Sequence, residues 1–498
     1  MFTRVRSEGA RASVPSADGI IKAWEWLNTT ILAFRGCFSR AATFRWFVVV
    51  LVGFIVWTEH AGVTSFIREL WINPRYYDAM LHFFRSNAWN IVQMRDCWIQ
   101  IVVRTRLLFL EGDMPILVGD GMKQSKEAKK MPCVKKMHQE SENSSKPSYI
   151  YGHMFGAIGV LVGNAKKKFC VPLSMTIQDG DKHISQWLNC DAEKESHVVR
   201  LIREACGIAS GFRHSILLLD RYFLSVPALK AWEEEEQRVG QPLVSIITKA
   251  KSSAIAYLDP IRKSGRGRPQ QKGEKVKLRD LFSTCADQFK QISVTMYGKE
   301  EIVSYLCKDL LWGDKLYRKL RFVLVCYEGT QSILVSTNLT FSPEQIIRLY
   351  SYRFKIECCF REWKQIIFGF VYHFWSSAVP KLNRYAKSGT DPLEHVDDKK
   401  DRQRILSAHR AIHGFVMISC IAMGLLQICA LRFSDVIYAS PLRWLRTRTN
   451  QIPSEATTAD FLRKSIFRMF YLKPDLDIIR LIRIVQLDIE DSCDSLAA

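Results

Sequence analysis

The sequence lacks the cysteine patterns that mark metal-binding or disulfide-rich proteins. Its 14 cysteines include no Cys-x-x-Cys pair and no Cys/His cluster with zinc spacing. Cys358 and Cys359 are adjacent and would point to different faces of a helix. We therefore expect all 14 cysteines to be reduced thiols in a cytosolic protein, and we set aside zinc-finger and disulfide-stabilised classes.

Long hydrophobic runs are also scarce. Trp46–Trp57 is apolar throughout but shorter than the roughly 20 residues of a membrane span. Gly414–Leu431 is longer and has only Ser419 and Gln427 as clearly polar side chains. The mixed, arginine-containing N-terminal segment predicts no secretory signal. We predict a buried core helix at Gly414–Leu431 and no membrane association, with a membrane span as the alternative.

Acidic residues are too few to balance the basic ones. The 498 residues include 71 Lys and Arg against 50 Asp and Glu, a net charge of +21. Such an excess predicts a polyanionic partner, either nucleic acid or an anionic membrane surface. Because the basic residues are spread along the chain, they favour an extended binding track over an anchoring tail.

The N-terminal region up to residue 105 has a mostly helical pattern with recurring tryptophans and arginines. It contains no clean helix-turn-helix. An ordinary helical domain and a DNA-binding domain both remain open for this region.

An α/β pattern begins near residue 115. Strands are predicted at Ile116–Val118, Tyr151–Val162, Phe169–Ile177, Ser215–Leu219 and Leu243–Thr248, and helices at His197–Ile208 and Pro227–Val239. A lysine-rich loop is expected between Lys123 and Lys146, and another polar loop at residues 380–405. Three strands, a helix, a strand, a helix and a strand follow the order of a ribonuclease-H-like sheet, although many α/β domains share parts of it.

Two aspartates follow apolar strands in this pattern. Asp120 comes after Ile116–Val118, and Asp220 comes after Ser215–Leu219. If the strands are neighbours, both carboxylates emerge near one sheet edge, where they could bind a hard cation such as Mg²⁺. Asp113 lies nearby, but Asp120 fits the strand end better.

A long helix is predicted from Ser342 to about Ile366. Ser342 fits the N-cap, followed by Pro at the first helical position and Gln three residues after the cap. Four side chains of this helix fall within an arc of about 60° at ~100° per residue: Tyr350, Arg353, Glu357 and Lys364. A solvated charged face is the alternative, although the other faces are largely apolar.

Tyr350-x-x-Arg353-x-x-x-Glu357-x-x-x-x-x-x-Lys364 resembles the YREK signature of DDE transposases from bacterial insertion sequences. The segment Asp220-Arg221-Tyr222-Phe223 resembles the second-aspartate motif of that family. The resemblance covers roughly residues 110–375.

The resemblance implies a fold, a reaction and partners. The fold is an α/β, ribonuclease-H-like mixed sheet with a β-rich insertion, preceded by a helical N-terminal domain. Two Mg²⁺ ions, replaceable by Mn²⁺, would be bound by Asp120, Asp220 and Glu357. Tyr350, Arg353 and Lys364 would bind phosphates of double-stranded DNA, at the element ends and in the target. A homodimer in the synaptic complex and a bacterial, nucleoid-associated cytoplasmic protein are implied as well.

Five regions follow along the chain. They are a helical N-terminal region with possible DNA binding (1–108), the first part of the catalytic core (109–250), an inserted β-rich subdomain (251–320), the second part of the core (321–440) and a helical C-terminal tail (441–498).

Further DNA contacts are predicted in or near the insertion. Arg266 and Arg268, in the sequence Gly-Arg-Gly-Arg-Pro, have the form of a minor-groove arm, with a loop that contacts only phosphates as the alternative. Trp312 could stack on an extruded base, or it could be a core residue. A ribonuclease-H-like nuclease without strand transfer, and an inactive DNA-binding descendant, stay as alternatives for the whole protein.

Overall fold

The computed structural model describes residues 17–58, 62–139, 148–189, 195–212, 214–261, 269–383, 385, 391–440 and 451–487. These residues form two compact units. The first unit takes its described residues from 1–101, 362–373 and 414–498, and the second takes them from 102–361 and 374–413.

The first unit is helical. Its helices are α1 (Ala17–Leu32), α2 (Ala41–Val56), α3 (Val63–Glu69), α4 (Tyr77–Arg85), most of α5 (Ile91–Arg104), the end of α11 (Lys355–Gln365), the C-terminal part of α12 (Lys399–Arg432), α13 (Ser434–Ala439), α14 (Glu455–Leu472) and α15 (Asp477–Arg483). Every residue of α2 from Trp46 to Val56 is buried, so this helix is apolar on all sides and occupies the core of the unit.

The predicted helix at Gly414–Leu431 is the C-terminal part of α12. Among the described residues, α12 is the one helix long and apolar enough to cross a membrane, and 94% of its apolar window is buried. The Phe415 ring lies 4.8 Å from that of Phe54 and 5.7 Å from that of Phe84, between ring centres. Ser419 Oγ accepts a hydrogen bond of 2.9 Å from Trp363 Nε1. This part of α12 therefore packs among the helices of the first unit.

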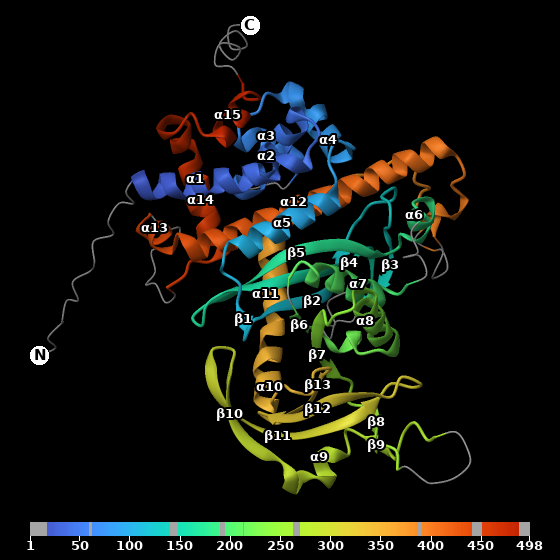
Figure 1. The fold of residues 1–498 in the computed structure, drawn as a ribbon. Coiled ribbons are helices and arrows are strands. Elements are labelled where there is room, and N and C mark those ends of the chain that lie inside the picture. Colours follow the sequence, from blue (N-terminus) through green and yellow to red (C-terminus); the bar gives the residue numbers. More distant parts are fainter. Residues whose placement is uncertain are drawn as a thin grey trace, which may run out of the picture. The chain divides into compact units, whose positions relative to one another are not determined.

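The described residues of the second unit form a sheet of 13 strands (Figure 1). The strands are β1 (Leu110–Glu111), β2 (Met114–Ser125), β3 (Lys135–His138), β4 (Tyr149–Gly163), β5 (Lys168–Asp179), β6 (Ser215–Leu218), β7 (Val244–Ala250), β8 (Ile255–Tyr257), β9 (Lys275–Lys277), β10 (Lys290–Met296), β11 (Lys299–Trp312), β12 (Arg318–Tyr327) and β13 (Thr330–Ser336). Their spatial order is β3-β4-β2-β6-β7-β13-β12-β11-β8-β9, with β5 paired to β4, β1 to β2 and β10 to β11.

The strands predicted from the α/β pattern are neighbours at one end of this sheet. They lie in the order β5-β4-β2-β6-β7, where β2 pairs antiparallel with β4, β4 antiparallel with β5, and β2 and β7 parallel with β6. Helix α7 (His197–Ala209) packs on β2, β4 and β5, and α8 (Val226–Val239) packs on α7 (Figure 1). This arrangement is compatible with the expected ribonuclease-H-like fold.

The strands between β7 and the helix at Ser342 extend the same sheet. Strand β13 pairs antiparallel with β7, with Ile333 opposite Ala250, and β12 and β11 follow. The short helices of the second unit are α6 (Lys182–Trp187) and α9 (Leu281–Thr284). The residues expected as an insertion thus share the backbone hydrogen bonds of the central sheet.

Three local expectations were wrong. The loop expected at Lys123–Lys146 begins as the last residues of β2 and contains β3, because Lys135–His138 pairs with Tyr149–Gly152 of β4. The loop expected at residues 380–405 ends earlier, since α12 begins at Lys399. The single long helix is divided into α10 (Pro343–Ser351), the 3₁₀ turn η6 (Tyr352–Phe354) and α11.

Candidate active site

Asp120 lies on β2, and Asp220 follows the end of the adjacent strand β6 at the equivalent position. The parallel register pairs Val118 with Leu218, and each aspartate comes two residues later. The sequence predicted that Asp120 ends its strand. This prediction is wrong, because β2 continues to Ser125 in its pairing with β4. The Asp220 carbonyl accepts a hydrogen bond of 2.9 Å from Thr248 Oγ1 of β7.

Gly119 permits close packing beside Asp120. A Cβ atom at Gly119 would lie 2.7 Å from Leu219 Cδ2 and 3.0 Å from Ile158 Cδ1, closer than carbon atoms pack. Glycine therefore lets the side chains around β2 fill the space beside the candidate carboxylates.

Helix α10, which precedes the helix of the third carboxylate, starts as the sequence predicts. Ser342 Oγ accepts a hydrogen bond of 3.1 Å from Gln345 N, and Gln345 Oε1 accepts one of 2.9 Å from Ser342 N. This capping box fixes the start of α10, which contacts β7 and β13 of the sheet. At its end, the Tyr352 N–H donates to the Leu349 carbonyl three residues back, so the chain tightens into the 3₁₀ turn η6 that contains Arg353.

Arg353 joins two of the predicted carboxylates. Its Nη1 donates to Asp120 Oδ2 at 3.1 Å, and its Nη2 donates to Glu357 Oε1, one helical turn further on. The Arg353 side chain is 15% exposed and the Asp120 side chain 19% exposed. This guanidinium therefore lies between carboxylates of β2 and α11. On a solvated helix face it would instead be surrounded by water.

Burial and charge shift the ionisation of these groups. Burial raises the pKa of Asp120 to about 6, although Arg353 and the Gly121 N–H favour its charged form. Burial opposes the charge of Arg353, but the carboxylates of Asp120 and Glu357 outweigh it and raise the pKa of Arg353. Burial also raises the pKa of Tyr350, so its hydroxyl is neutral and can donate a hydrogen bond.

An opening of about 290 Å³ lies in front of Asp220. It is lined by Asp220, Arg221, Lys249, Tyr297, Tyr350, Ser351, Arg353 and Phe354. Two of the predicted phosphate-binding residues, Tyr350 and Arg353, therefore share this opening with the second aspartate.

Lys249 and Tyr297 are among the side chains of this opening that sequence reasoning did not select. Lys249 lies on β7, next to the strand that precedes Asp220. Tyr297 is the first residue of a two-residue turn between β10 and β11, with φ of 53° followed by 86° at Gly298. Positive φ at both positions is typical of a type I′ hairpin. The Tyr-Gly pair between two strand-like runs was the available signal, but nothing local indicated which site the turn would approach.

The other predicted DNA-binding residues do not converge on this opening. Lys364 is exposed on α11, seven residues after Glu357. Trp312 is half-buried at the end of β11, where it pairs with Arg318, and it does not line the opening. Arg266 and Arg268 lie outside the described residues.

Within the described part of the chain, no group of three or more His, Cys, Asp or Glu side chains is arranged to hold a metal ion. The guanidinium of Arg353 is nevertheless a cation held by both Asp120 and Glu357. The Asp220 carboxylate is near enough to raise the pKa of Asp120. The donor set is thus composed of carboxylate oxygens, which suit a hard divalent cation, and two of the three carboxylates already share a positive charge.

Comparison with known proteins gives one family match. The model of the DDE superfamily endonucleases matches residues 33–297, more than half of the chain. This match includes Asp120 and Asp220 and ends before Glu357. No curated protein and no solved structure matches the chain. Because the match covers more than half of the chain, the chain belongs to the DDE superfamily endonucleases.

Proposed function

We propose that this endonuclease is a DNA transposase, which cuts the ends of a mobile element and joins them to target DNA. The observation that supports this proposal best is the convergence of Asp120, Asp220 and Arg353 with Glu357. Asp120 on β2 and Asp220 just after β6 come at equivalent positions of two parallel strands, and Arg353 links Asp120 to the glutamate. The spacing of Tyr350, Arg353, Glu357 and Lys364 supports membership of the YREK group from bacterial insertion sequences.

Asp120, Asp220 and Glu357 would hold Mg²⁺ in this enzyme, and Mn²⁺ could replace it. When bound, divalent cations supply an activated water and neutralise charge on the phosphate that is attacked. A divalent cation would compete with the Arg353 guanidinium for Asp120 and Glu357. Deprotonated Asp120 is required for such binding, because a protonated carboxyl is a poor ligand for a hard cation.

The remaining side chains of the opening would position the DNA backbone. Arg353 has the planar fork that binds two phosphate oxygens at once, whereas Lys249 acts as a point charge. The neutral Tyr350 hydroxyl can donate to a phosphate oxygen without adding negative charge. Together these groups would hold the scissile phosphate next to Asp220, with Arg221 beside it.

A nuclease that cuts without joining is the second candidate, because the family that matches is named for endonuclease activity. The two functions share the same carboxylates and differ in the fate of the 3′-hydroxyl. For the transposase we further propose a homodimer that pairs two element ends, in the bacterial cytoplasm.

The test uses the inverted repeats expected to flank the reading frame as DNA ends, with Mg²⁺ and a supercoiled target plasmid. Asp120→Asn, Asp220→Asn and Glu357→Gln should each slow cleavage while end binding is retained. The decrease in rate should exceed the roughly 10- to 100-fold that follows the loss of a residue that only supports a metal ligand. Asp113→Asn is the matched control, since Asp113 is an exposed carboxylate seven residues before Asp120. It should cleave at nearly the wild-type rate.

Each outcome of this test has a meaning. Full-rate cleavage by any of the three variants removes that residue from the site. Wild-type cleavage without joined target products supports the nuclease. Binding without any metal-dependent cleavage would instead support an inactive DNA-binding descendant.

A further inference from the structure

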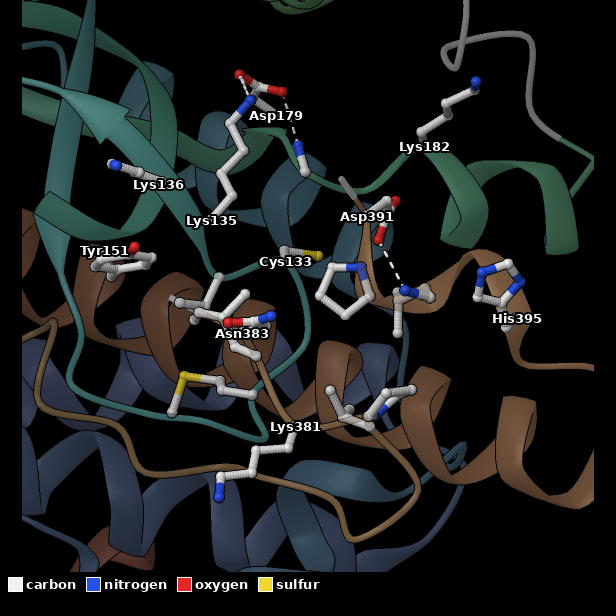
Figure 2. Close-up of a pocket in the computed structure, with 18 residues that line it drawn as sticks. Cys133, Lys135, Lys136, Tyr151, Asp179, Lys182, Lys381, Asn383, Asp391 and His395 are labelled. Carbon is white, nitrogen blue, oxygen red and sulfur yellow. Dashed lines mark hydrogen bonds and ion pairs between the residues drawn. The ribbon is translucent and has the colours of Figure 1, made fainter. Parts of the chain in front are cut away.

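A second cavity of about 530 Å³ lies elsewhere in the second unit (Figure 2). Residues from β3 and the segment before it, from β4, from the end of β5, from the start of α6 and from 379–383 and 391–395 line it. The residues on which its chemistry depends are Lys135, Tyr151, Asp179, Lys182, Lys381 and Asn383. None of them belongs to the candidate active site.

The cavity wall is fixed by backbone hydrogen bonds between segments far apart in the sequence. Ser376 N donates to the Lys130 carbonyl at 3.0 Å, and Leu382 N donates to the Lys129 carbonyl at 2.9 Å. Asp391 caps the 3₁₀ turn η7 (Pro392–His395) by accepting from Leu393 N at 2.9 Å. The cavity is therefore a built feature of the unit.

The charge in this cavity is unbalanced toward positive. Asp179 is neutralised by an ion pair with Lys135 and also accepts from Gly180 N at 2.8 Å. Lys182 and Lys381 are exposed and form no ion pair with another described residue. In Figure 2 their ammonium groups lie on opposite sides of the view, with Asn383 nearer the middle. These two lysines are available to an anion.

Part of the cavity lining is apolar, with the ring of Tyr151 beside it. Met131, Val134 and Leu393 are buried side chains of the lining, and Tyr151 is half-buried. An apolar surface with an aromatic ring suits a planar heterocycle. Asn383 Oδ1 already accepts from Tyr385 N at 3.0 Å, and the Asn383 amide NH₂ can donate to the edge of such a heterocycle. The volume falls within the roughly 300–1,000 Å³ typical of small-molecule sites.

We propose that this cavity binds a nucleoside phosphate, with the base against Tyr151 and Asn383 and the phosphate at Lys182 or Lys381. The ligand has two possible sources, a free mononucleotide or a nucleotide extruded from bound DNA. The second source rests on the proposed function. Tyr151 lies six residues along β4 from Ala157, the partner of Asp120, which is a distance of roughly 20 Å along the strand. A nucleotide a few positions from the cut would therefore reach the cavity.

The first arm of the test omits DNA and metal. ATP and, separately, inorganic phosphate are titrated into the full chain in a calorimeter. A Lys182→Glu/Lys381→Glu double variant should bind ATP at least about tenfold more weakly, because charge-assisted contacts to phosphate are lost and repulsion is added. The control is Lys230→Glu on α8, which reverses another exposed lysine of the same unit. Both lysines of the double variant are exposed, so folding should survive, and a thermal unfolding curve checks this.

The second arm uses element-end duplexes with 2-aminopurine at successive positions. Extrusion unstacks the probe, so its fluorescence should rise at one position in the wild type and in Lys230→Glu, and should be lost in the double variant. Catalytically dead Asp120→Asn should keep this signal, which separates failure of the cavity from failure of the proposed transposase chemistry.

ATP binding alone identifies a free nucleotide as the ligand, and a fluorescence rise alone identifies an extruded one. Inorganic phosphate that binds as tightly as ATP would overturn the nucleoside part of the proposal. The whole proposal is overturned if neither arm gives a signal, or if Lys230→Glu and the double variant behave alike.

Discussion

The two units bury different kinds of side chain. The first unit is filled by apolar helices such as α2, where even the glycine of the stretch Trp46–Val56 is buried. The second unit buries more titratable side chains, namely Asp181, which pairs with Arg200 at 2.7 Å, Glu235 and the fully buried His153. Among the described residues of the first unit, Glu455 is the buried carboxylate. Because a buried charge is costly unless it is paired, the second unit depends more on such pairs, whereas the first is held mainly by apolar packing.

The largest expected effect tests apolar packing in the first unit. Phe54 of α2 is fully buried and its ring packs edge-on against those of Trp57, Phe66 and Phe415. Phe54→Ala should lower the free energy of unfolding by about 3–5 kcal/mol, measured by denaturant titration. Trp71→Ala is the control, since Trp71 is 66% exposed in the same unit, and its effect should stay within about 0.5 kcal/mol. Equal effects would show that packing does not hold this unit together.

The next effect concerns the paired charge in the second unit. Arg353→Ala should slow end cleavage by roughly a hundredfold, because the variant loses a preorganised donor at the reacting phosphate. The slope of log binding constant against log salt should fall by about 0.9, the value of one phosphate contact. Arg353→Lys should lie between wild type and Ala, since lysine keeps the charge and loses the fork.

Arg361→Ala is the matched control for Arg353. Arg361 is an exposed arginine of α11 outside the YREK positions, and its loss should matter less. Lys364→Ala should reduce binding and the salt slope by one contact as well. If binding and cleavage are equally insensitive to the loss of Arg353, Arg361 and Lys364, this side of the helix is only a solvated charged face. The YREK assignment would then lose its main support.

Local patterns predicted part of this molecule well. The capping box at Ser342 depends on residues within one helical turn, and the positions of the strands along the chain near β2 follow from apolar runs and turn residues. Three features depend on tertiary pairing instead. Strand β2 continues past Asp120 because β4 pairs with it, Lys249 and Tyr297 reach one opening through the sheet, and the second cavity needs Leu382 to pair with Lys129. No single segment of sequence contains that information.

The third effect is a pH dependence that the second unit should show. Burial lowers the pKa of His153 to about 3, against an ordinary value of 6.5, with smaller effects from the Pro132 carbonyl, Lys126 and His413. The folded state therefore binds fewer protons than the unfolded state between these values. Stability contributed by neutral His153 is present above pH 6.5 and is lost as the pH falls toward 3.

At pH 5 this loss amounts to about 2 kcal/mol for His153. The measurement compares unfolding free energies at pH 7 and pH 5 in the wild type and in His153→Gln, whose amide can replace the 2.8 Å hydrogen bond from His153 Nε2 to the Pro132 carbonyl. The variant should show a smaller decrease between the two pH values. An unchanged decrease would assign the pH dependence to other groups, such as His409 and His413, whose pKa values burial also lowers.

The smallest expected effect compares two exposed aromatic side chains, one in each unit. Tyr297 is 71% exposed at the tip of the β10–β11 hairpin and lines the opening with Asp220 and Tyr350. A ring in that place can stack on a base next to the cut, which is worth about 1–3 kcal/mol per base. Because Tyr297 is exposed, we expect the lower end of this range. Tyr297→Ala should weaken end binding roughly fivefold without changing stability, whereas Tyr297→Phe, which keeps the ring, should bind like the wild type.

Trp71→Ala in the first unit should also leave end binding unchanged. If Tyr297→Phe binds as poorly as Tyr297→Ala, the hydroxyl and not the ring contacts DNA, and if Trp71→Ala weakens binding equally, DNA recognition is shared between the units.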